Sequence, residues 1–169
     1  MKQDLLDRVE IIDLVARYCR GCDRRDFALV RSCYHDDAID DHGAMFRGGP
    51  DEFVAWLPTA MAPWDLTIHA ISNSVVVVDG DRAEGEHLVR AWHRTHGPDR
   101  REFIVWGRYL DKYERRGGEW KFLHRSLVFD HGEVRAVDED AFARMGADAA
   151  HGTAGRDDPS WLMELLSRL

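Results

Sequence analysis

The sequence predicts a single α+β domain in which helices come first and an antiparallel sheet follows. Three helical patterns precede Pro63, and four long strand patterns follow it without a helix between them. Parallel βαβ units would alternate the two kinds of element, so this separation favours an antiparallel sheet packed against helices. The dipeptides Asp79-Gly80 and Gly117-Gly118 are typical of tight hairpin turns between such strands.

The helices are predicted from apolar spacing and from residues that favour helix starts. A first helix extends from a cap at Asp4 to about Cys22, and its two apolar stripes indicate that it is covered on both sides. A second begins at an Asp26 cap and continues through about Tyr34, and a third fits Pro50 to Met61. The stripes of the first helix are Leu5, Val9, Ile12, Ala16 and Cys19, and Ile11, Leu14, Val15 and Tyr18.

The strand patterns cover residues 66–78, 82–96, 103–115 and 119–129. Alternation places Trp106, Phe122 and Val128 on the outer face of the sheet, which predicts a homo-oligomer, either a trimer or a dimer. We assign residues 1–135 to the main domain. Residues 136–158 are rich in Ala, Gly and Asp and are typical of a linker, and a short amphipathic helix is expected from Pro159, so 136–169 either completes this domain or joins a subunit interface.

Composition and charge exclude several classes of protein. At 169 residues with 44% apolar residues, the chain has the size and composition of one globular domain. Its formal net charge of −8, with basic residues interspersed among acidic ones, argues against nucleic acid as a partner. No basic leader and no run of about 18 apolar residues occurs, so we expect a cytoplasmic protein without membrane contact. Cys19, Cys22 and Cys33 are expected to be reduced structural thiols.

Four segments together resemble the SnoaL-like branch of the nuclear transport factor 2-like superfamily. They are residues 18–26 (Tyr-Cys-Arg-Gly-Cys-Asp-Arg-Arg-Asp), 34–38 (Tyr-His-Asp-Asp-Ala), His69 with Asn73 on a strand, and 113–122 (Tyr-Glu-Arg-Arg-Gly-Gly-Glu-Trp-Lys-Phe). The resemblance covers residues 5–131. That branch includes scytalone dehydratase, bile acid 7α-dehydratase and hexachlorocyclohexane dehydrochlorinase. It implies a cone-shaped, curved sheet covered by N-terminal helices, with a ligand held in the cone.

The resemblance also implies catalytic residues. Its lyases pair a cavity Asp with a cavity His that removes a proton from the substrate, and the matching positions are Asp23 and His69. Tyr18 and Arg125 match positions that assist the leaving group. The dehydrochlorinase has Lys where this chain has Tyr18, and the tyrosine favours a hydroxyl or carbonyl oxygen over chloride as the group being handled.

These side chains suit an elimination without a cofactor. Imidazole titrates near pH 6.5, so a neutral His69 can act as a base, and Asp23 would fix its tautomer and stabilise the imidazolium. Tyr18 can donate a hydrogen bond to the oxygen on which charge develops, and Arg125 adds positive charge. The alternative interpretation is purely structural: His69 is a hydrogen-bonded histidine on a strand, and Asp23 is a turn or cap residue.

Seven further residues are predicted to bind a small hydrophobic or aromatic substrate. Asp41 and His42 are interpreted as rim groups or a second orienting pair, and the Arg24-Arg25 and Arg115-Arg116 pairs as solvated faces. The neighbouring Asp40, like His93 and His96, has no metal-ligand spacing, so we expect no metal. The predicted substrate-binding residues are Tyr34, Asp41, His42, Asn73, Trp56, Trp92 and Phe129.

We therefore predict a cofactor-independent lyase that eliminates water or another small group, including formaldehyde, from an aromatic or polycyclic molecule. A steroid or polyketide isomerase or cyclase is the second hypothesis, since it needs a base and an oxyanion partner but no leaving group. A noncatalytic subunit, similar to the small subunit of ring-hydroxylating dioxygenases, is the third. A dyad that faces a cavity favours an enzyme, and a cone filled by side chains favours the subunit.

Overall fold

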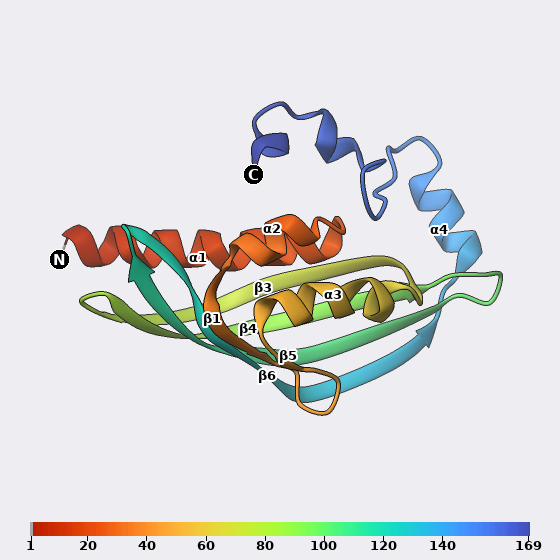
Figure 1. The fold of residues 1–169 in the computed structure, drawn as a ribbon. Helices are drawn as coiled ribbons and strands as arrows, with labels where there is room; N and C mark the ends of the chain where they lie inside the picture. Colours follow the sequence, from red (N-terminus) through yellow and green to blue (C-terminus); the bar gives the residue numbers. More distant parts are fainter. Residues whose placement is uncertain (1) are drawn as a thin grey trace.

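The computed structural model describes residues 2–169 and confirms the α+β architecture. Figure 1 shows one strongly curved sheet with α1, α2 and α3 lying over its concave side. The helices are α1 (Lys2–Asp23), α2 (Phe27–Ser32), α3 (Pro50–Met61) and α4 (Glu139–Gly146), followed by the short 3-10 turns η1 (Pro159–Leu162) and η2 (Leu166–Arg168). The strands are β1 (Tyr34–Asp41), β2 (Arg47–Gly48), β3 (Trp64–Asp79), β4 (Arg82–Thr95), β5 (Arg101–Arg116) and β6 (Glu119–Ala136).

The sheet has the order β2-β1-β6-β5-β4-β3, in which β3 to β6 form the expected antiparallel meander. Strand β1 was not predicted, and α2 ends at Ser32 instead of continuing through Tyr34. The acidic β1 sequence has little intrinsic preference for a strand, but it pairs in parallel with β6, where Tyr34 lies opposite Phe122 and Asp40 opposite Arg125. This pairing brings two buried polar groups, Tyr34 and Asp40, beside Arg125.

Helix α1 buries one of its two apolar stripes. Ile11, Leu14 and Val15 are almost fully buried in the core under the helices, whereas Leu5 and Val9 are 64% and 57% exposed. The prediction that α1 is covered on both sides is therefore wrong for its first turns within the described chain. An amphipathic helix needs only one apolar stripe to hold it against a sheet.

A bulge in β6 changes which side chains face the core. Tyr113 pairs with Phe122 and Lys112 with His124, so Leu123 is an extra residue without a partner on β5. Phe122 and Arg125 are consequently both fully buried, although they are three residues apart. The expectation that Phe122 lies on the outer face is wrong for this reason. Oligomerisation itself stays a prediction.

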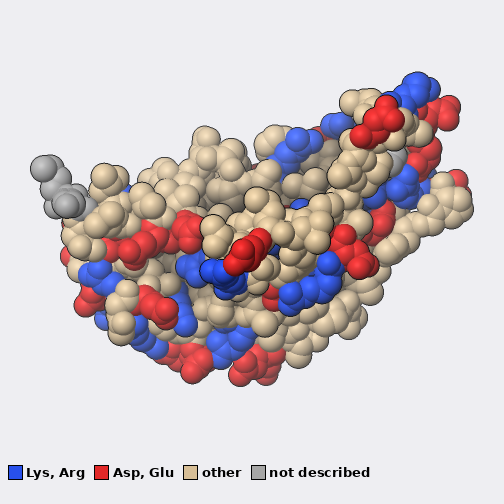
Figure 2. Space-filling model, turned by 90° about the horizontal axis from the view of Figure 1, so that it is seen from above, with Lys and Arg blue, Asp and Glu red and all other residues tan. Residues whose placement is uncertain are grey.

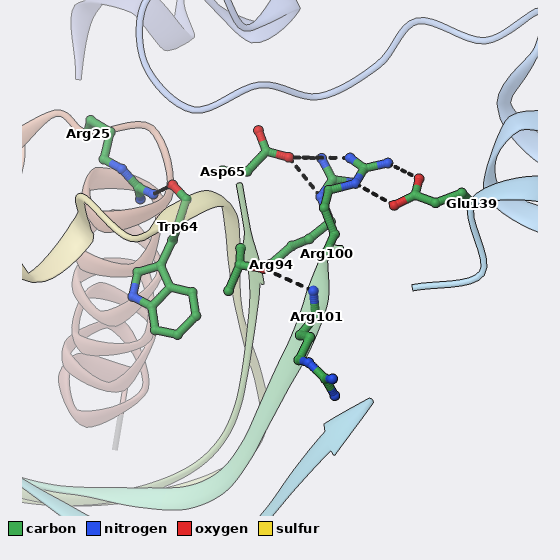
Figure 3. A network of polar contacts seen from close by, with 8 residues as sticks. Arg25, Trp64, Asp65, Arg94, Arg100, Arg101 and Glu139 are labelled. Atoms are coloured by element: carbon green, nitrogen blue, oxygen red, sulfur yellow. Dashed lines mark hydrogen bonds and ion pairs between the residues drawn. The ribbon is translucent and has the colours of Figure 1, made fainter. Parts of the chain in front are cut away.

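Part of the predicted C-terminal linker forms a helix. Strand β6 continues to Ala136, and α4 follows it. Figure 3 shows Arg100 between Asp65 and Glu139, with Arg94 reaching the same Asp65 carboxylate. This network attaches α4 to the end of the sheet. The predicted C-terminal helix is replaced by the two 3-10 turns η1 and η2. None of the helices within residues 2–169 is long and apolar enough to span a membrane.

Candidate functional site

Asp23 and His69 form a hydrogen-bonded pair between the end of α1 and the edge strand β3. Asp23 Oδ1 lies 2.7 Å from His69 Nδ1, and Asp23 Oδ2 accepts the His69 backbone N–H at 2.9 Å. Thr67 donates its hydroxyl to Asp23 Oδ1 at 2.9 Å. A carboxylate in this position favours the tautomer with the proton on Nδ1 and leaves Nε2 as the acceptor. The described residues provide no partner for His69 Nε2.

Arg25 contacts the Asp23–His69 pair indirectly, through Thr67. Its guanidinium donates to Thr67 Oγ1 at 2.9 Å, to the Cys22 carbonyl at 2.8 Å and to the Trp64 carbonyl at 3.4 Å. The last contact is drawn in Figure 3. Its backbone φ of 55° lies in the left-handed region, which is unfavourable for a side-chain-bearing residue. The prediction that Arg25 belongs to a solvated face is wrong, because it orders the chain that ends in Asp23.

In the other predicted solvated pair, Arg115-Arg116, the two arginines differ from each other. Arg115 donates to Asp7 Oδ1 at 2.8 Å, and Asp7 is 2% exposed, so this arginine pairs with a buried carboxylate. Arg116 is exposed and pairs with Asp37. Only Arg116 fits the expected solvated face.

The Asp23–His69 pair lies in a pocket of about 370 Å³ between the last turns of α1 and strand β3. The His69 side chain is 9% exposed and that of Asp23 is 11% exposed. The predicted arrangement, a hydrogen-bonded pair in one pocket, is therefore present in the structure. The pocket is lined by Ala16, Cys19, Arg20, Asp23, Arg24, His69 and Ile71.

His93 lies next to this pair, with its ring centre 5.5 Å from that of His69. Burial, reinforced by the neighbouring His69, lowers the pKa of His93 to about 4. His93 is therefore neutral at physiological pH and adds no positive charge beside His69.

Arg125 is fully buried and paired. It binds Asp111 through two hydrogen bonds of 2.9 and 2.7 Å. Its guanidinium carbon lies 4.2 Å from the Tyr18 ring centre and 4.0 Å from those of Tyr109 and Phe122. Burial alone would lower the pKa of Arg125, but the Asp111 carboxylate outweighs it and raises the pKa. The positive charge of Arg125, which was expected to assist a leaving group, is thus largely neutralised by the Asp111 carboxylate.

Tyr18 lies in the same interior cluster. It is 2% exposed, and its ring packs edge-on against Tyr34 and Tyr109. Burial raises the pKa of Tyr18 well above its usual range, so the hydroxyl stays protonated and keeps its capacity to donate a hydrogen bond at neutral pH. Neither Tyr18 nor Arg125 is among the residues that line the pocket of Asp23 and His69.

A second aspartate–histidine pair occurs on β1 and the loop after it. His42 Nδ1 lies 2.5 Å from Asp40 Oδ1, and Tyr34 donates its hydroxyl to Asp40 Oδ2 at 2.6 Å. The partner of His42 is thus Asp40, whereas Asp41 accepts the Gly43 backbone N–H. The predicted pairing of Asp41 with His42 is wrong because alternation along β1 turns Asp40, not Asp41, into the core.

The remaining predicted substrate-binding residues lie apart from the dyad pocket. Trp56 packs on Phe46 at 5.2 Å between ring centres. Asn73 is exposed at a bulge in β3, and Phe129 is 64% exposed. Trp92 follows Ala91, which pairs with His69, so alternation places Trp92 on the opposite face of the sheet.

Cys19, Cys22 and Cys33 are free and buried. Burial raises the pKa of Cys19 to about 12 and that of Cys33 to about 11, which makes both thiols poor nucleophiles. Within residues 2–169, no group of three or more His, Cys, Asp or Glu side chains is placed to hold a metal ion.

The chain is similar to proteins of known sequence and structure. An uncharacterised protein of Mycobacterium tuberculosis is 27% identical over 127 residues, which cover 72% of this chain and 84% of that protein. A solved protein of Kribbella flavida is 29% identical with a TM-score of 0.70, over 77% of this chain and 95% of that one. A hexachlorocyclohexane dehydrochlorinase is 24% identical with a TM-score of 0.70, over 79% of this chain and 91% of that one, and it shows likeness of fold alone.

The family assignment comes from a sequence model that spans most of the chain. Residues 3–126 match the model of the SnoaL-like domain, and this segment contains α1, the strands of the meander up to the bulge in β6, and both aspartate–histidine pairs. The fold and the matched segment together establish that this chain belongs to the SnoaL-like domain family.

Proposed function

We propose that this protein is a cofactor-independent lyase in which neutral His69 removes a proton from a carbon atom of a small aromatic or polycyclic substrate. The observation that carries the proposal is the Asp23–His69 hydrogen bond of 2.7 Å in a pocket large enough for a small molecule. Asp23 holds the ring orientation and stabilises the imidazolium that forms when Nε2 takes the proton.

His69 can carry out both proton transfers that the elimination needs. His69 Nε2 takes the proton, the electrons of the C–H bond form the new double bond, and the bond from the adjacent carbon to oxygen breaks. The imidazolium can return its proton to the departing hydroxyl on the same face, so water leaves and neutral His69 is restored. No external oxidant or cofactor is required by this sequence of steps.

Tyr18 and Arg125 contribute to the proposal in different ways. Tyr18 stays protonated and is a candidate hydrogen-bond donor to a substrate oxygen that reaches the interior cluster. Arg125 shares its charge with Asp111 and contacts the Tyr18 ring, so we assign it to positioning Tyr18 instead of direct contact with the leaving group.

The experiment that tests this function is a mass-spectrometric screen of the purified protein against hydroxylated aromatics and steroids, with His69→Ala as the matched blank. The proposal expects a product lighter by the eliminated molecule, formed by the wild type and not by the variant. A product of unchanged mass that depends on His69 would instead indicate an isomerase or cyclase. Equal product from both proteins would contradict a role for His69.

One observation favours a different function. The concave side of the sheet is filled by the side chains of Tyr18, Tyr34, Phe53, Tyr109, Tyr113 and Phe122, as expected for a noncatalytic subunit. In that case the Asp23–His69 pair would only join α1 to β3. His69→Ala would then lower the free energy of unfolding, and no substrate in the screen would be converted by either protein.

A further inference from the structure

One wall of the dyad pocket carries an arginine without an acidic partner. Arg20 lines the pocket together with His69, and its Nη2 atom is buried without a hydrogen-bond partner. Its Nη1 atom donates to Ser160 Oγ at 3.2 Å, and its guanidinium lies 5.5 Å from the Trp161 ring centre. Among the residues that the structure describes, no carboxylate forms an ion pair with Arg20.

Arg20 differs in this respect from Arg17 and Arg24, the nearest arginines on either side of it in the sequence, which both pair with a carboxylate. The sequence holds 31 Asp and Glu against 23 Lys and Arg, and Figure 2 shows the two charge types interspersed over the face it presents. The next arginine along the same helix side, Arg24, is paired with Asp158 at 3.3 Å. Asp23 already accepts three hydrogen bonds from Thr67 and His69. Asp158 is thus paired with Arg24, Asp23 is hydrogen-bonded to Thr67 and His69, and neither carboxylate forms an ion pair with Arg20.

An arginine in a pocket wall without a carboxylate partner is suited to bind an anion, because its guanidinium is always charged and its planar fork can donate two hydrogen bonds to a carboxylate. Ala16, Cys19 and Ile71 also line the pocket and offer apolar contact for the rest of a ligand, while Asp23 and Arg24 are its other charged lining residues. The C-terminal segment closes the far side of the fork through Ser160 and Trp161.

We propose that Arg20 is the anion-binding group of this pocket and that the substrate of His69 is an organic acid. That the bound acid is a substrate rests on the proposed function, but the binding of an acid at Arg20 does not require catalysis. The carboxylate of the ligand would lie at Arg20, and its carbon skeleton would extend along the apolar wall toward His69 Nε2. The C-terminal segment is then part of the ligand site.

Binding of matched probes tests the site without turnover. Naphthalene-2-carboxylate and its neutral amide have the same shape, so their affinities at constant ionic strength isolate the contribution of charge. We expect the wild type to bind the acid about tenfold or more tightly than the amide. The signals of the Arg20 side chain in ¹⁵N NMR spectra should shift during the titration with acid and not with amide.

Three variants separate the explanations. Arg20→Met keeps most of the apolar stem and should lose the preference for the acid, and Arg20→Lys should restore part of it. Arg17→Met, which removes an α1 arginine that is paired with Asp13 and does not line the pocket, should keep the full preference. His69→Ala should also keep it, because the base does not hold the anion.

The outcomes are distinct from those of the proposed function. The inference is overturned if acid and amide bind equally, if the preference survives Arg20→Met, or if acid up to about 50 mM leaves the Arg20 signals unmoved. Arg20→Met that lowers only the free energy of unfolding would show that Arg20 merely anchors the C-terminal segment. Turnover of a neutral substrate that depends on His69 but not on Arg20 would refute the inference and support the lyase.

Discussion

The two aspartate–histidine pairs of this protein have similar hydrogen bonds but different surroundings. Nδ1 of His69 lies 2.7 Å from Asp23, and Nδ1 of His42 lies 2.5 Å from Asp40. The histidine side chains are 9% and 12% exposed. His69 lines a pocket of about 370 Å³, whereas the His42 ring stacks on Phe53 with 5.5 Å between ring centres.

The carboxylates differ as well. Asp40 is fully buried and also accepts the Tyr34 hydroxyl, so it joins β1 to the aromatic core. Asp23 joins two elements that are distant in sequence, and its partner His69 lines a pocket. A hydrogen-bonded pair therefore does not identify a catalytic base by itself. The pocket beside its ring is what distinguishes His69 from His42, whose ring is covered by Phe53.

Removing each histidine in turn tests most directly whether the two pairs differ in function. His69→Ala should lower kcat by on the order of 10³-fold or more, because the substrate proton then has no acceptor. His42→Ala should change kcat by less than about tenfold. Both are measured with a substrate found in the screen. A larger loss for His42→Ala would transfer the role of base to the second pair.

Replacement of the carboxylate sharpens the same comparison. Asp23→Asn keeps the shape of the side chain but favours the wrong tautomer of His69, so kcat should fall by about several hundredfold or more. Asp40→Asn, the matched change in the other pair, should leave kcat within about tenfold of wild type and act on the free energy of unfolding. Equal losses of kcat would mean that the two pairs are functionally coupled.

Arg125 provides a third buried carboxylate pair, and its expected effect is on stability. Arg125→Met leaves Asp111 buried without its partner and should lower the free energy of unfolding by about 3 to 5 kcal/mol. Arg116→Met removes an exposed pair with Asp37 and should cost less than about 1 kcal/mol. Urea denaturation measures both. A loss of kcat without a loss of stability in Arg125→Met would restore the catalytic role implied by the family resemblance.

The smallest expected effect concerns His93, which must stay neutral beside His69. Its pKa of about 4 in the folded protein lies below its ordinary value of about 6.5. The stability that this depressed pKa reflects is complete above about pH 6.5 and is lost as the pH falls toward 4. Between about pH 7 and pH 5 the wild type should therefore lose on the order of 2 kcal/mol more than His93→Phe, measured by urea denaturation at each pH. Parallel stability curves for the two proteins would contradict the depressed pKa.

Much of the fold could be predicted because its strongest signals are local. The Asp79-Gly80 and Gly117-Gly118 turns and the helix that begins at Pro50 are all found where they were expected. Strand β1 was missed, because its run of aspartates becomes a strand only by pairing with β6. The position of Phe122 was wrong because a single extra residue, Leu123, breaks the alternation.

The candidate site was predictable in part for the same reasons. Asp23 and His69 came from a resemblance in sequence, and alternation along β3 places Thr67 on the same face as His69, so that supporting residue could have been found. Asp111 lies opposite Arg125 only because of the bulge in β6, which the sequence does not reveal. The roles of Arg20 and Arg25 depend on tertiary contacts with the C-terminal segment and with Thr67.

The central claim is that Asp23 holds the ring proton of His69 on Nδ1 and so leaves Nε2 to accept a proton from the substrate. Two-dimensional ¹⁵N NMR of the histidine side chains tests it without a substrate, because protonated and unprotonated ring nitrogens have different shifts. The account predicts that at neutral pH His69 carries its proton on Nδ1 with Nε2 unprotonated, and that Asp23→Asn disturbs this tautomer while Asp40→Asn does not. A His69 that is an imidazolium at neutral pH, or that carries its proton on Nε2, would contradict the account.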